Sequence, residues 1–196
     1  LNVDGAVDQT FDIGSGFDGT INEIAVQTDG KIIVGGIFQS FNGYVRQRIA
    51  RINADGSLDQ TFDVGSPGLS NGANIIVPLA NGKILVGGSF THLNNSLVGG
   101  IVRLNSDGTR DLSFNPGGTG AGAPMNVLRQ VDGIVVQASG KLIVGGTFWS
   151  FNDVPLQSLA RLNADGSLDT SYLLSAIHSI YELAPDRNGK VLVGGN

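Results

Sequence analysis

Short apolar runs separated by glycine-rich polar turns recur along the whole chain. The clearest run reads Asp29-Gly-Lys-Ile-Ile-Val-Gly-Gly-Ile-Phe38, and it returns at 81–90, 139–148 and 188–195. β-Branched and aliphatic residues dominate the runs, whereas Gly, Asn and Asp stand between them. No stretch keeps the 3.6-residue apolar period of a helix. The pattern therefore predicts an all-β protein with almost no helix.

A second motif runs in step with the first one. It reads Ile52-Asn-Ala-Asp-Gly-Ser-Leu-Asp-Gln-Thr-Phe62, and related versions stand at 1–11, 104–114 and 162–172. Both motifs return about every 50 residues, a period typical of propellers, solenoids and other repeat arrays. We interpret each repeat unit as four short strands, which in the first complete unit are 21–27, 31–38, 48–53 and 57–63.

Cross-strand pairing predicts the turn between the third and fourth strands. A three-residue loop at 54–56 places Ile52 opposite Leu58 and Arg51 opposite Asp59, so that apolar meets apolar and opposite charges meet. A two-residue loop would instead set Ile52 against Asp59. We therefore expect a type I turn with Gly56 in the left-handed bulge position.

Four-stranded antiparallel units of about 50 residues are the blades of a β-propeller. We expect 1–12 to end a preceding blade, 20–63, 74–115 and 127–173 to form blades, and 178–196 to form the first half of another. The chain then represents roughly three and a half blades of a larger ring or array. The alternative is a distorted closed ring of four blades.

Composition and charge narrow the function classes. The 196 residues include 30 glycines and no cysteine, which excludes disulfides and thiolate metal sites. The net charge is −5, and the lysines and several arginines are spread by the repeat rather than gathered into a patch. Nucleic acid is therefore not expected as a partner, and no apolar run approaches the ~20 residues of a membrane span.

The repeated motifs resemble the delta-60 repeat family of bacterial β-propellers. The resemblance rests on Asp-Gly-Lys-Ile-Ile-Val-Gly-Gly-x-Phe, then Phe-Asn-Gly, then Ile-Ala-Arg-Ile-Asn-Ala-Asp-Gly-Ser-Leu-Asp-Gln-Thr-Phe, and it covers essentially the whole chain. It implies a secreted or surface-attached bacterial protein, so we expect an extracellular or cell-surface location. The family has no settled activity and provides no catalytic residues to transfer.

Residues that recur in every unit are expected to serve the architecture. The turn carboxylates, such as Asp55 and Asp59, fit hairpin turns and ion pairs better than a calcium site. The lysine after the first turn, such as Lys31, is expected to cover the blade or to form an ion pair between blades. The Val-Gly-Gly runs fit close backbone packing. The Phe-x-x-x-Asn pairs fit a Phe in the core between blades and a loop-bracing Asn, as in Phe38 and Asn42.

Residues that do not recur are better candidates for binding. In up-and-down blades, the loops after the second and the fourth strands lie on one side, and these loops vary along the chain. They carry the tentative binding residues Tyr44, Arg46, His92, Trp149 and Asp153. We expect no catalytic residue, no metal ligand and no cofactor, because His92 and His178 lack the motifs that accompany catalytic or metal-binding histidines.

Two functions follow as hypotheses. The first is a non-enzymatic structural or binding module that contacts a protein or a glycan through the variable loops. The second is a glycan hydrolase or lyase that uses Glu23 and Glu182, the two glutamates of the chain, on the innermost strands. We also expect contacts with other parts of a larger chain or self-assembly, because the sheet ends of such an array are open.

Overall fold

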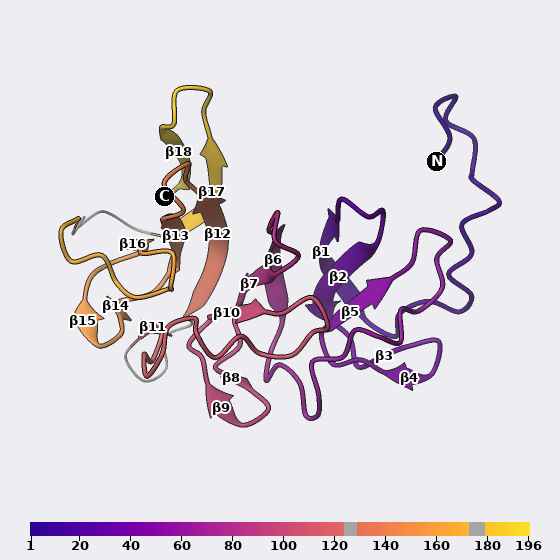
Figure 1. Cartoon of the computed structure of the whole chain (residues 1–196), viewed down its shortest axis with the longest axis horizontal. Coiled ribbons are helices and arrows are strands. Elements are labelled where there is room, and N and C mark those ends of the chain that lie inside the picture. Colours follow the sequence, from indigo (N-terminus) through magenta and orange to yellow (C-terminus); the bar gives the residue numbers. More distant parts are fainter. Residues whose placement is uncertain (124–128, 173–178) are drawn as a thin grey trace.

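The computed structural model describes residues 1–123, 129–172 and 179–196, which form strands and turns without any helix. The strands gather into antiparallel sheets that follow one another along an arc (Figure 1). These sheets confirm the predicted all-β architecture of propeller blades. Within the described residues, we find no helix with the length and apolar character needed to cross a membrane.

Each of the first three units contains a three-stranded sheet whose second strand lies in the middle. The fourth unit contributes a pair of strands. The strands of these sheets are, unit by unit, β1 (Thr20–Val26), β2 (Ile32–Ile37) and β5 (Ile49–Ile52); β6 (Ala73–Pro78), β7 (Ile84–Gly88) and β10 (Ile101–Leu104); β12 (Gln130–Val136), β13 (Leu142–Thr147) and β16 (Leu159–Leu162); and β17 (Ile180–Pro185) and β18 (Val191–Gly195).

In the first three units, the loop after the second strand forms a small hairpin that the sequence did not predict. The hairpins lie on the lower side of the arc in Figure 1, opposite the turns that join first and second strands. Their strands are β3 (Ser40–Phe41) with β4 (Tyr44–Val45), β8 (His92–Leu93) with β9 (Ser96–Leu97), and β14 (Ser150–Phe151) with β15 (Val154–Pro155), to which β11 (Ala121–Gly122) is added.

The double glycine of each second strand is required by two close approaches. A Cβ on Gly36 of β2 would overlap the carbonyl oxygen of Thr20, where β1 carries a bulge. A Cβ on Gly35 would lie 2.8 Å from Cδ1 of Ile76, which comes from the next unit. The glycine pair thus lets two strands approach and leaves room for an apolar side chain of the neighbouring sheet. The prediction of close packing is confirmed.

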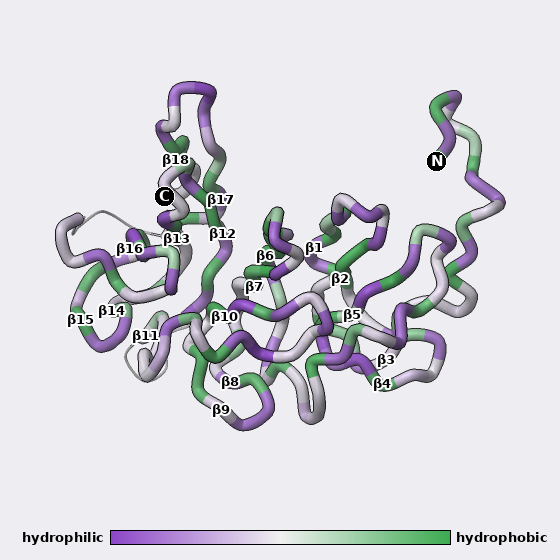
Figure 2. The backbone as a smooth tube through the Cα atoms, in the orientation of Figure 1, coloured by the Kyte–Doolittle hydropathy of each residue, from purple (hydrophilic) through white to green (hydrophobic). Residues whose placement is uncertain are grey.

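The hydrophobic core lies between neighbouring sheets. Ile33 and Ile49 of the first unit pack in one cluster with Ala73 and Ile76 of the second. Equivalent clusters join the second unit to the third and the third to the fourth. Figure 2 shows hydrophobic segments along the strands and hydrophilic turns between the first and second strands. Because each sheet is covered by the next one, the fold depends on repetition.

The turn at 54–56 has the predicted register; it precedes residues 57–63, which the sequence predicted as the fourth strand and which we call the fourth segment of the unit. Ile52 forms an antiparallel bridge with Leu58, the N–H of Asp59 donates to the carbonyl of Arg51 at 2.9 Å, and Gly56 has φ 90°. The three-residue loop with a left-handed glycine is therefore confirmed. The same bridge joins Leu104 with Arg110 and Leu162 with Leu168.

The fourth segment pairs through that single bridge and does not continue as a strand. Oδ1 of Asp59 accepts hydrogen bonds from the N–H and the hydroxyl of Thr61, at 2.9 and 2.6 Å, and this turn bends the chain out of the extended conformation. The N–H of Asp63 then donates to the carbonyl of Asp107 in the next unit at 2.9 Å. The fourth segment therefore closes its own sheet and reaches the following one.

The two ends of the chain lie at opposite ends of the arc (Figure 1). The alternative of a closed ring of four blades is therefore wrong for this structure. The packing of each unit agrees with this, because neighbouring sheets share apolar clusters that join the first unit to the second, the second to the third and the third to the fourth.

We predict that Gly56→Ala destabilises the protein more than Gly30→Ala. Both glycines have positive φ, 90° and 82°, so both substitutions cost the left-handed strain of about 1 kcal/mol. A Cβ on Gly56 would also lie 2.6 Å from the carbonyl oxygen of Asp12, whereas the nearest atom to a Cβ on Gly30 is 3.8 Å away. Urea denaturation should show a loss of about 2–3 kcal/mol for Gly56→Ala. Equal losses for the two variants would contradict the close contact with Asp12.

Candidate functional site

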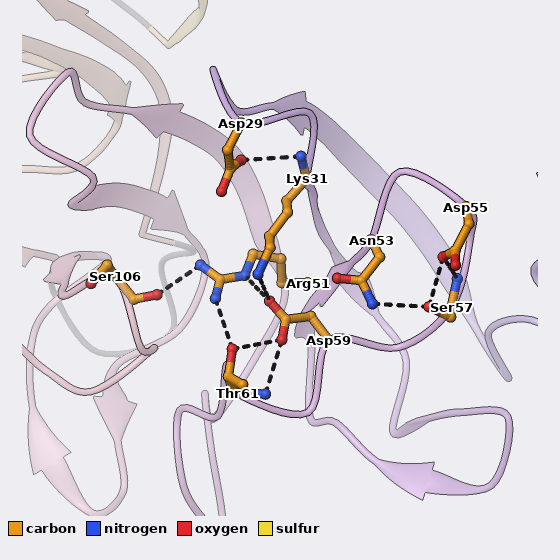
Figure 3. Close-up of polar contacts among 9 residues, drawn as sticks. All are labelled: Asp29, Lys31, Arg51, Asn53, Asp55, Ser57, Asp59, Thr61 and Ser106. Atoms are coloured by element: carbon orange, nitrogen blue, oxygen red, sulfur yellow. Dashed lines mark hydrogen bonds and ion pairs between the residues drawn. The ribbon is translucent and has the colours of Figure 1, made fainter.

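The repeated lysine belongs to a charged cluster in each of the first three units. Nζ of Lys31 and Nε of Arg51 both donate to Oδ2 of Asp59, at 2.8 and 2.7 Å, and Thr61 occupies Oδ1 (Figure 3). Both oxygens of the Asp59 carboxylate therefore accept hydrogen bonds. The lysine has a structural role, but its ion pair lies within a unit, and the predicted pairing between blades is wrong. The clusters of the next two units are Lys83, Arg103 and Asp111, and Lys141, Arg161 and Asp169.

The arginine of the cluster links neighbouring units. A terminal nitrogen of Arg51 donates to the carbonyl of Ser106 at 2.7 Å, across the joint to the second unit (Figure 3). Arg103 makes the same bond to Ala164 of the third unit, also at 2.7 Å. The guanidinium of Arg51 lies 4.8 Å from the ring centroid of Phe62, where a cation–π contact adds to the charge pair.

The turn carboxylates are engaged locally. Oδ1 of Asp55 accepts from the N–H and hydroxyl of Ser57 at 2.9 and 2.7 Å, and these hydrogen bonds hold the pKa of Asp55 below its usual range. This is an Asx turn, as the sequence predicted. Among the described residues, no three His, Cys, Asp or Glu side chains gather in an arrangement that could hold a metal ion.

The small hairpins share one supporting frame. The side-chain oxygen of Asn42 accepts from the N–H of Gly16 at 2.9 Å, and Asn94 and Asn152 hold Gly68 and Gly120 in the same way, at 2.8 Å each. A buried phenylalanine precedes each hairpin in the sequence: Phe38, Phe90 and Phe148. The predicted loop-brace role of the Asn is confirmed. The predicted place of the Phe in the core between blades is confirmed for Phe90 and Phe148, whereas Phe38 packs within the first unit.

Exposed aromatic side chains stand on two of the hairpins. Tyr44 on β4 is 52% exposed, and Trp149, directly before β14, is 49% exposed. Asp153 lies at the exposed turn between β14 and β15 with φ 63°. Trp149 and Asp153 share a hairpin, whereas Tyr44 belongs to the first unit. The candidates are therefore distributed along the lower side of the arc (Figure 1).

Two of the tentative binding residues are held by local contacts. The Arg46 side chain is mostly buried, donates to the carbonyl of Val45 at 2.8 Å and lies 3.8 Å from a carboxylate oxygen of Asp63. It takes the position that the buried Val98 occupies in the second unit. The partly exposed His92 on β8 shares a 2.7 Å hydrogen bond between Nδ1 and the hydroxyl of Thr91. His178 lies outside the described residues.

A polar ladder on the inner strands was missed from the sequence. The first strands of successive units contact one another and line the inner edge of the arc. The side-chain amide of Asn22 lies 3.2 Å from the side-chain oxygen of Asn74, and the amide of Asn74 donates to Asp132 at 2.9 Å. In the described part of the chain, the other carboxylate oxygen of Asp132 is buried without a hydrogen-bond partner. Burial raises the pKa of Asp132 despite the bond from Asn74.

The two glutamates lie on the first strands of the first and the fourth unit. Glu23 on β1 and Glu182 on β17 occupy equivalent positions, each opposite the first glycine of the Val-Gly-Gly run. Burial raises the pKa of Glu23, and the negative charge of Glu182 raises it further.

Comparison with known proteins gives a family whose description is a β-propeller domain of unknown function, DUF5122, matched at residues 27–62, 79–114 and 137–172. The three matches cover more than half of the chain, and each one runs from the first turn of a unit through its charged cluster. The chain belongs to the DUF5122 β-propeller family. A search of curated proteins finds no match.

One solved structure similar to this chain is the extracellular domain of a one-component system protein from B. thetaiotaomicron. The two chains share 16% sequence identity with a TM-score of 0.48. The aligned region covers 89% of this chain and 20% of the other one, so this chain spans a fifth of that protein's length.

The DUF5122 matches do not include the polar ladder. The charged clusters and hairpins lie inside the matches, whereas Asn22, Asn74 and Asp132 lie outside them, on the first strands. The sequence signal for the ladder was a polar residue directly before the position opposite the first glycine. This signal could be interpreted only with the structure, because a bulge in each first strand decides which side chains point inward.

We predict that Asp59→Asn lowers the free energy of unfolding by about 2–4 kcal/mol, because Lys31 and Arg51 lose the charge that balances them. Burial alone would raise the pKa of Asp59, but hydrogen bonds from Lys31, Thr61 and Arg51 outweigh it and hold that pKa well below its usual range. The folded state then binds fewer protons than the unfolded state. The stabilisation is complete at neutral pH and is lost below about pH 4.

The measurement is urea denaturation of both proteins between neutral and acidic pH. The wild type should lose stability more steeply than Asp59→Asn as the pH falls. Asp29→Asn is the control, because Asn81 already stands at the equivalent exposed turn. A variant with an unchanged acid slope would contradict the role of the cluster.

We predict that Asp132→Asn stabilises the folded protein at neutral pH by about 0.5–1 kcal/mol, because it removes a buried charge and keeps an acceptor for Asn74. The pKa of Asp132 is raised in the folded state, so the wild type takes up a proton as the pH falls and the difference disappears. Thermal unfolding at several pH values tests this, with the exposed Asp153→Asn as control. A loss of stability would show that a positive partner balances the Asp132 charge.

Proposed function

We propose that this chain is a non-enzymatic binding module of a secreted or cell-surface bacterial protein. One observation supports this proposal above the others. The three hairpins rest on the same frame of buried Phe and bracing Asn, yet their exposed residues differ from unit to unit. A rigid scaffold with variable loops is the usual arrangement for recognition.

The exposed side chains favour a protein or a glycan as the partner. Tyr44 and Trp149 offer flat apolar surface with a polar atom at its edge, which suits stacking on a sugar ring or a protein contact. Asp153 adds a hydrogen-bond acceptor on the same hairpin as Trp149. The acidic net charge of −5 disfavours nucleic acid and anionic membranes.

The proposed location rests on the resemblance to the delta-60 repeats, which implies a large secreted or surface-attached bacterial protein. The absence of cysteine agrees with a fold that is held by packing and ion pairs. We propose the same origin for this chain, with the propeller as its binding part.

A glycan hydrolase or lyase is the second candidate, because one observation favours it. Glu23 has a pKa raised by burial and by the charge of Glu182, and glycoside hydrolysis requires a protonated acid beside an ionised carboxylate. Both glutamates lie on first strands, opposite the first glycine of their unit. We rank this candidate second, because burial contributes more to the shift than the pairing does.

The test is a glycan array and an extracellular protein pull-down with the wild type and with the variant Tyr44→Ala/Trp149→Ala. Because both side chains are about half exposed, the variant should fold, and binding should fall about tenfold or more. Leu112→Ala, at an exposed residue of a fourth segment, is the control. Binding that survives the double substitution would contradict the hairpin proposal. Sugar release that Glu23→Gln abolishes would support the enzyme.

A further inference from the structure

The chain contains four Asn-Gly pairs, and this dipeptide can rearrange when the glycine nitrogen attacks the asparagine side chain. Glycine lacks a Cβ, so its nitrogen is open to the approach of the side-chain carbon. The pairs are Asn42-Gly43, Asn71-Gly72, Asn81-Gly82 and Asn188-Gly189, and all of them lie in the described part of the chain. The four pairs look alike in the sequence, whereas the structure distinguishes them.

Two of the pairs lie in turns between first and second strands, where the glycine nitrogen is engaged elsewhere. The N–H of Gly82 donates to the carbonyl of Leu79 at 2.9 Å. The N–H of Gly189 donates to the carbonyl of Asp186 at 3.3 Å. These hydrogen bonds close the turns and hold each glycine nitrogen against a backbone carbonyl. The nitrogen is therefore kept from the asparagine side chain.

A third pair is held through its side chain. Oδ1 of Asn42 accepts from the N–H of Gly16 and from the hydroxyl of Ser15, at 2.9 Å each. Both donors lie in the loop before β1. The amide group of Asn42 is thus committed to bracing this loop rather than to its own glycine, Gly43.

Asn71 has a different arrangement. The N–H of Gly72 donates to Oδ1 of Asn71 itself, at 2.9 Å. The carbon Cγ lies one C=O bond from Oδ1, about 1.2 Å, so the carbon that accepts the attack lies beside the attacking nitrogen. Asn71 is exposed, so water and hydroxide reach this side chain.

The second unit fixes both sides of this pair. Oγ of Ser70 accepts from the N–H groups of Thr91 and His92, at 2.9 and 3.0 Å. The carbonyl of Gly72 accepts from the N–H of Ser89 at 3.1 Å. Reacting groups that a fold already holds in place lose less entropy when they react. The fold therefore holds this pair in a favourable position for ring closure.

We propose that Asn71 is a site of spontaneous modification, at which the folded protein converts asparagine into aspartate and isoaspartate. The backbone nitrogen of Gly72 gives up its proton and forms a bond to Cγ of Asn71, which closes a cyclic imide. The Cγ–Nδ2 bond breaks, and Nδ2 leaves as ammonia with that proton. Water then opens the ring. Cleavage of the bond from nitrogen to Cγ gives aspartate, whereas cleavage of the bond from nitrogen to the backbone carbonyl carbon gives isoaspartate.

The product affects the joint between the first and the second unit. A Cβ on Gly72 would lie 3.1 Å from Cγ1 of Ile37 and 3.4 Å from the side-chain nitrogen of Asn22, both in the first unit. Gly72 also directly precedes β6, whose Ala73 pairs with Gly88. Isoaspartate adds a methylene to the main chain immediately before this contact. The isoaspartyl form therefore has a weaker joint than the form with ordinary aspartate.

Peptide mapping by mass spectrometry, after incubation of the 196-residue chain at mildly alkaline pH, tests the proposal. In the folded protein, we expect Asn71 to deamidate about tenfold or more faster than the asparagines of the other three pairs. In urea, where the hydrogen bonds are lost, the four rates should become similar. Asn71→Gln should remove the early release of ammonia, because its longer side chain closes a ring far more slowly. The matched variant Asn81→Gln should leave that release unchanged.

A second measurement tests the effect on the joint. The isoaspartyl form, separated by ion-exchange chromatography, should unfold at a lower urea concentration than Asn71→Asp, which carries the same charge on an ordinary backbone. Equal rates at the four pairs in the folded protein would overturn the proposal. So would a preference for Asn71 that persists in urea, because it would come from the neighbouring sequence rather than from the fold. An isoaspartyl form as stable as Asn71→Asp would overturn the effect on the joint.

Discussion

The structure depends on one contact, in which an apolar side chain of one sheet rests on a glycine of the sheet before it. Ile76 on Gly35 is the first instance, and Leu183 on Gly145 is the last described one. A single unit of about 50 residues has too little interior to stand alone. The contact compensates for this small interior, because each unit covers the apolar face of its neighbour. Glycine is thus required at these positions by an apolar side chain that lies about 50 residues away in the sequence.

Electrostatics secures the outer edge of the same joints. One carboxylate, such as Asp59, balances a lysine and an arginine of its own unit, and the arginine then reaches the backbone of the next unit. A buried ion pair alone is a poor source of stability. Here its geometry fixes the fourth segment, which pairs with its sheet through only one bridge. The charged cluster therefore holds the fourth segment against its sheet, where further strand pairing is absent.

Repetition explains why much of the fold could be predicted from the sequence. The register at Ile52 and Leu58 follows from pairing apolar with apolar across a turn whose glycine is recognisable. The lysine could be assigned to the architecture because it recurs, but its partner could not be placed, since that required knowing how far the fourth segment bends. The turn at Asp59 and Thr61 makes that bend with side-chain hydrogen bonds.

The candidate site was less predictable for a related reason. Tyr44 and Trp149 were found as residues that do not recur, and their exposure agrees with a surface role. The ladder of Asn22, Asn74 and Asp132 escaped notice, because a bulge of one residue decides which side chains face inward. Arg46 was taken as a binding residue, although it fills a position where other units place an aliphatic side chain. The polarity of a residue alone therefore did not show whether its side chain is exposed for binding or packed within the fold.

The arginine bond between units has a consequence for how the molecule comes apart. The second unit receives such a bond from Arg51 and provides one through Arg103. Local opening of this unit therefore has to break contacts with both of its neighbours. The array behaves as one cooperative body rather than as a row of independent small domains.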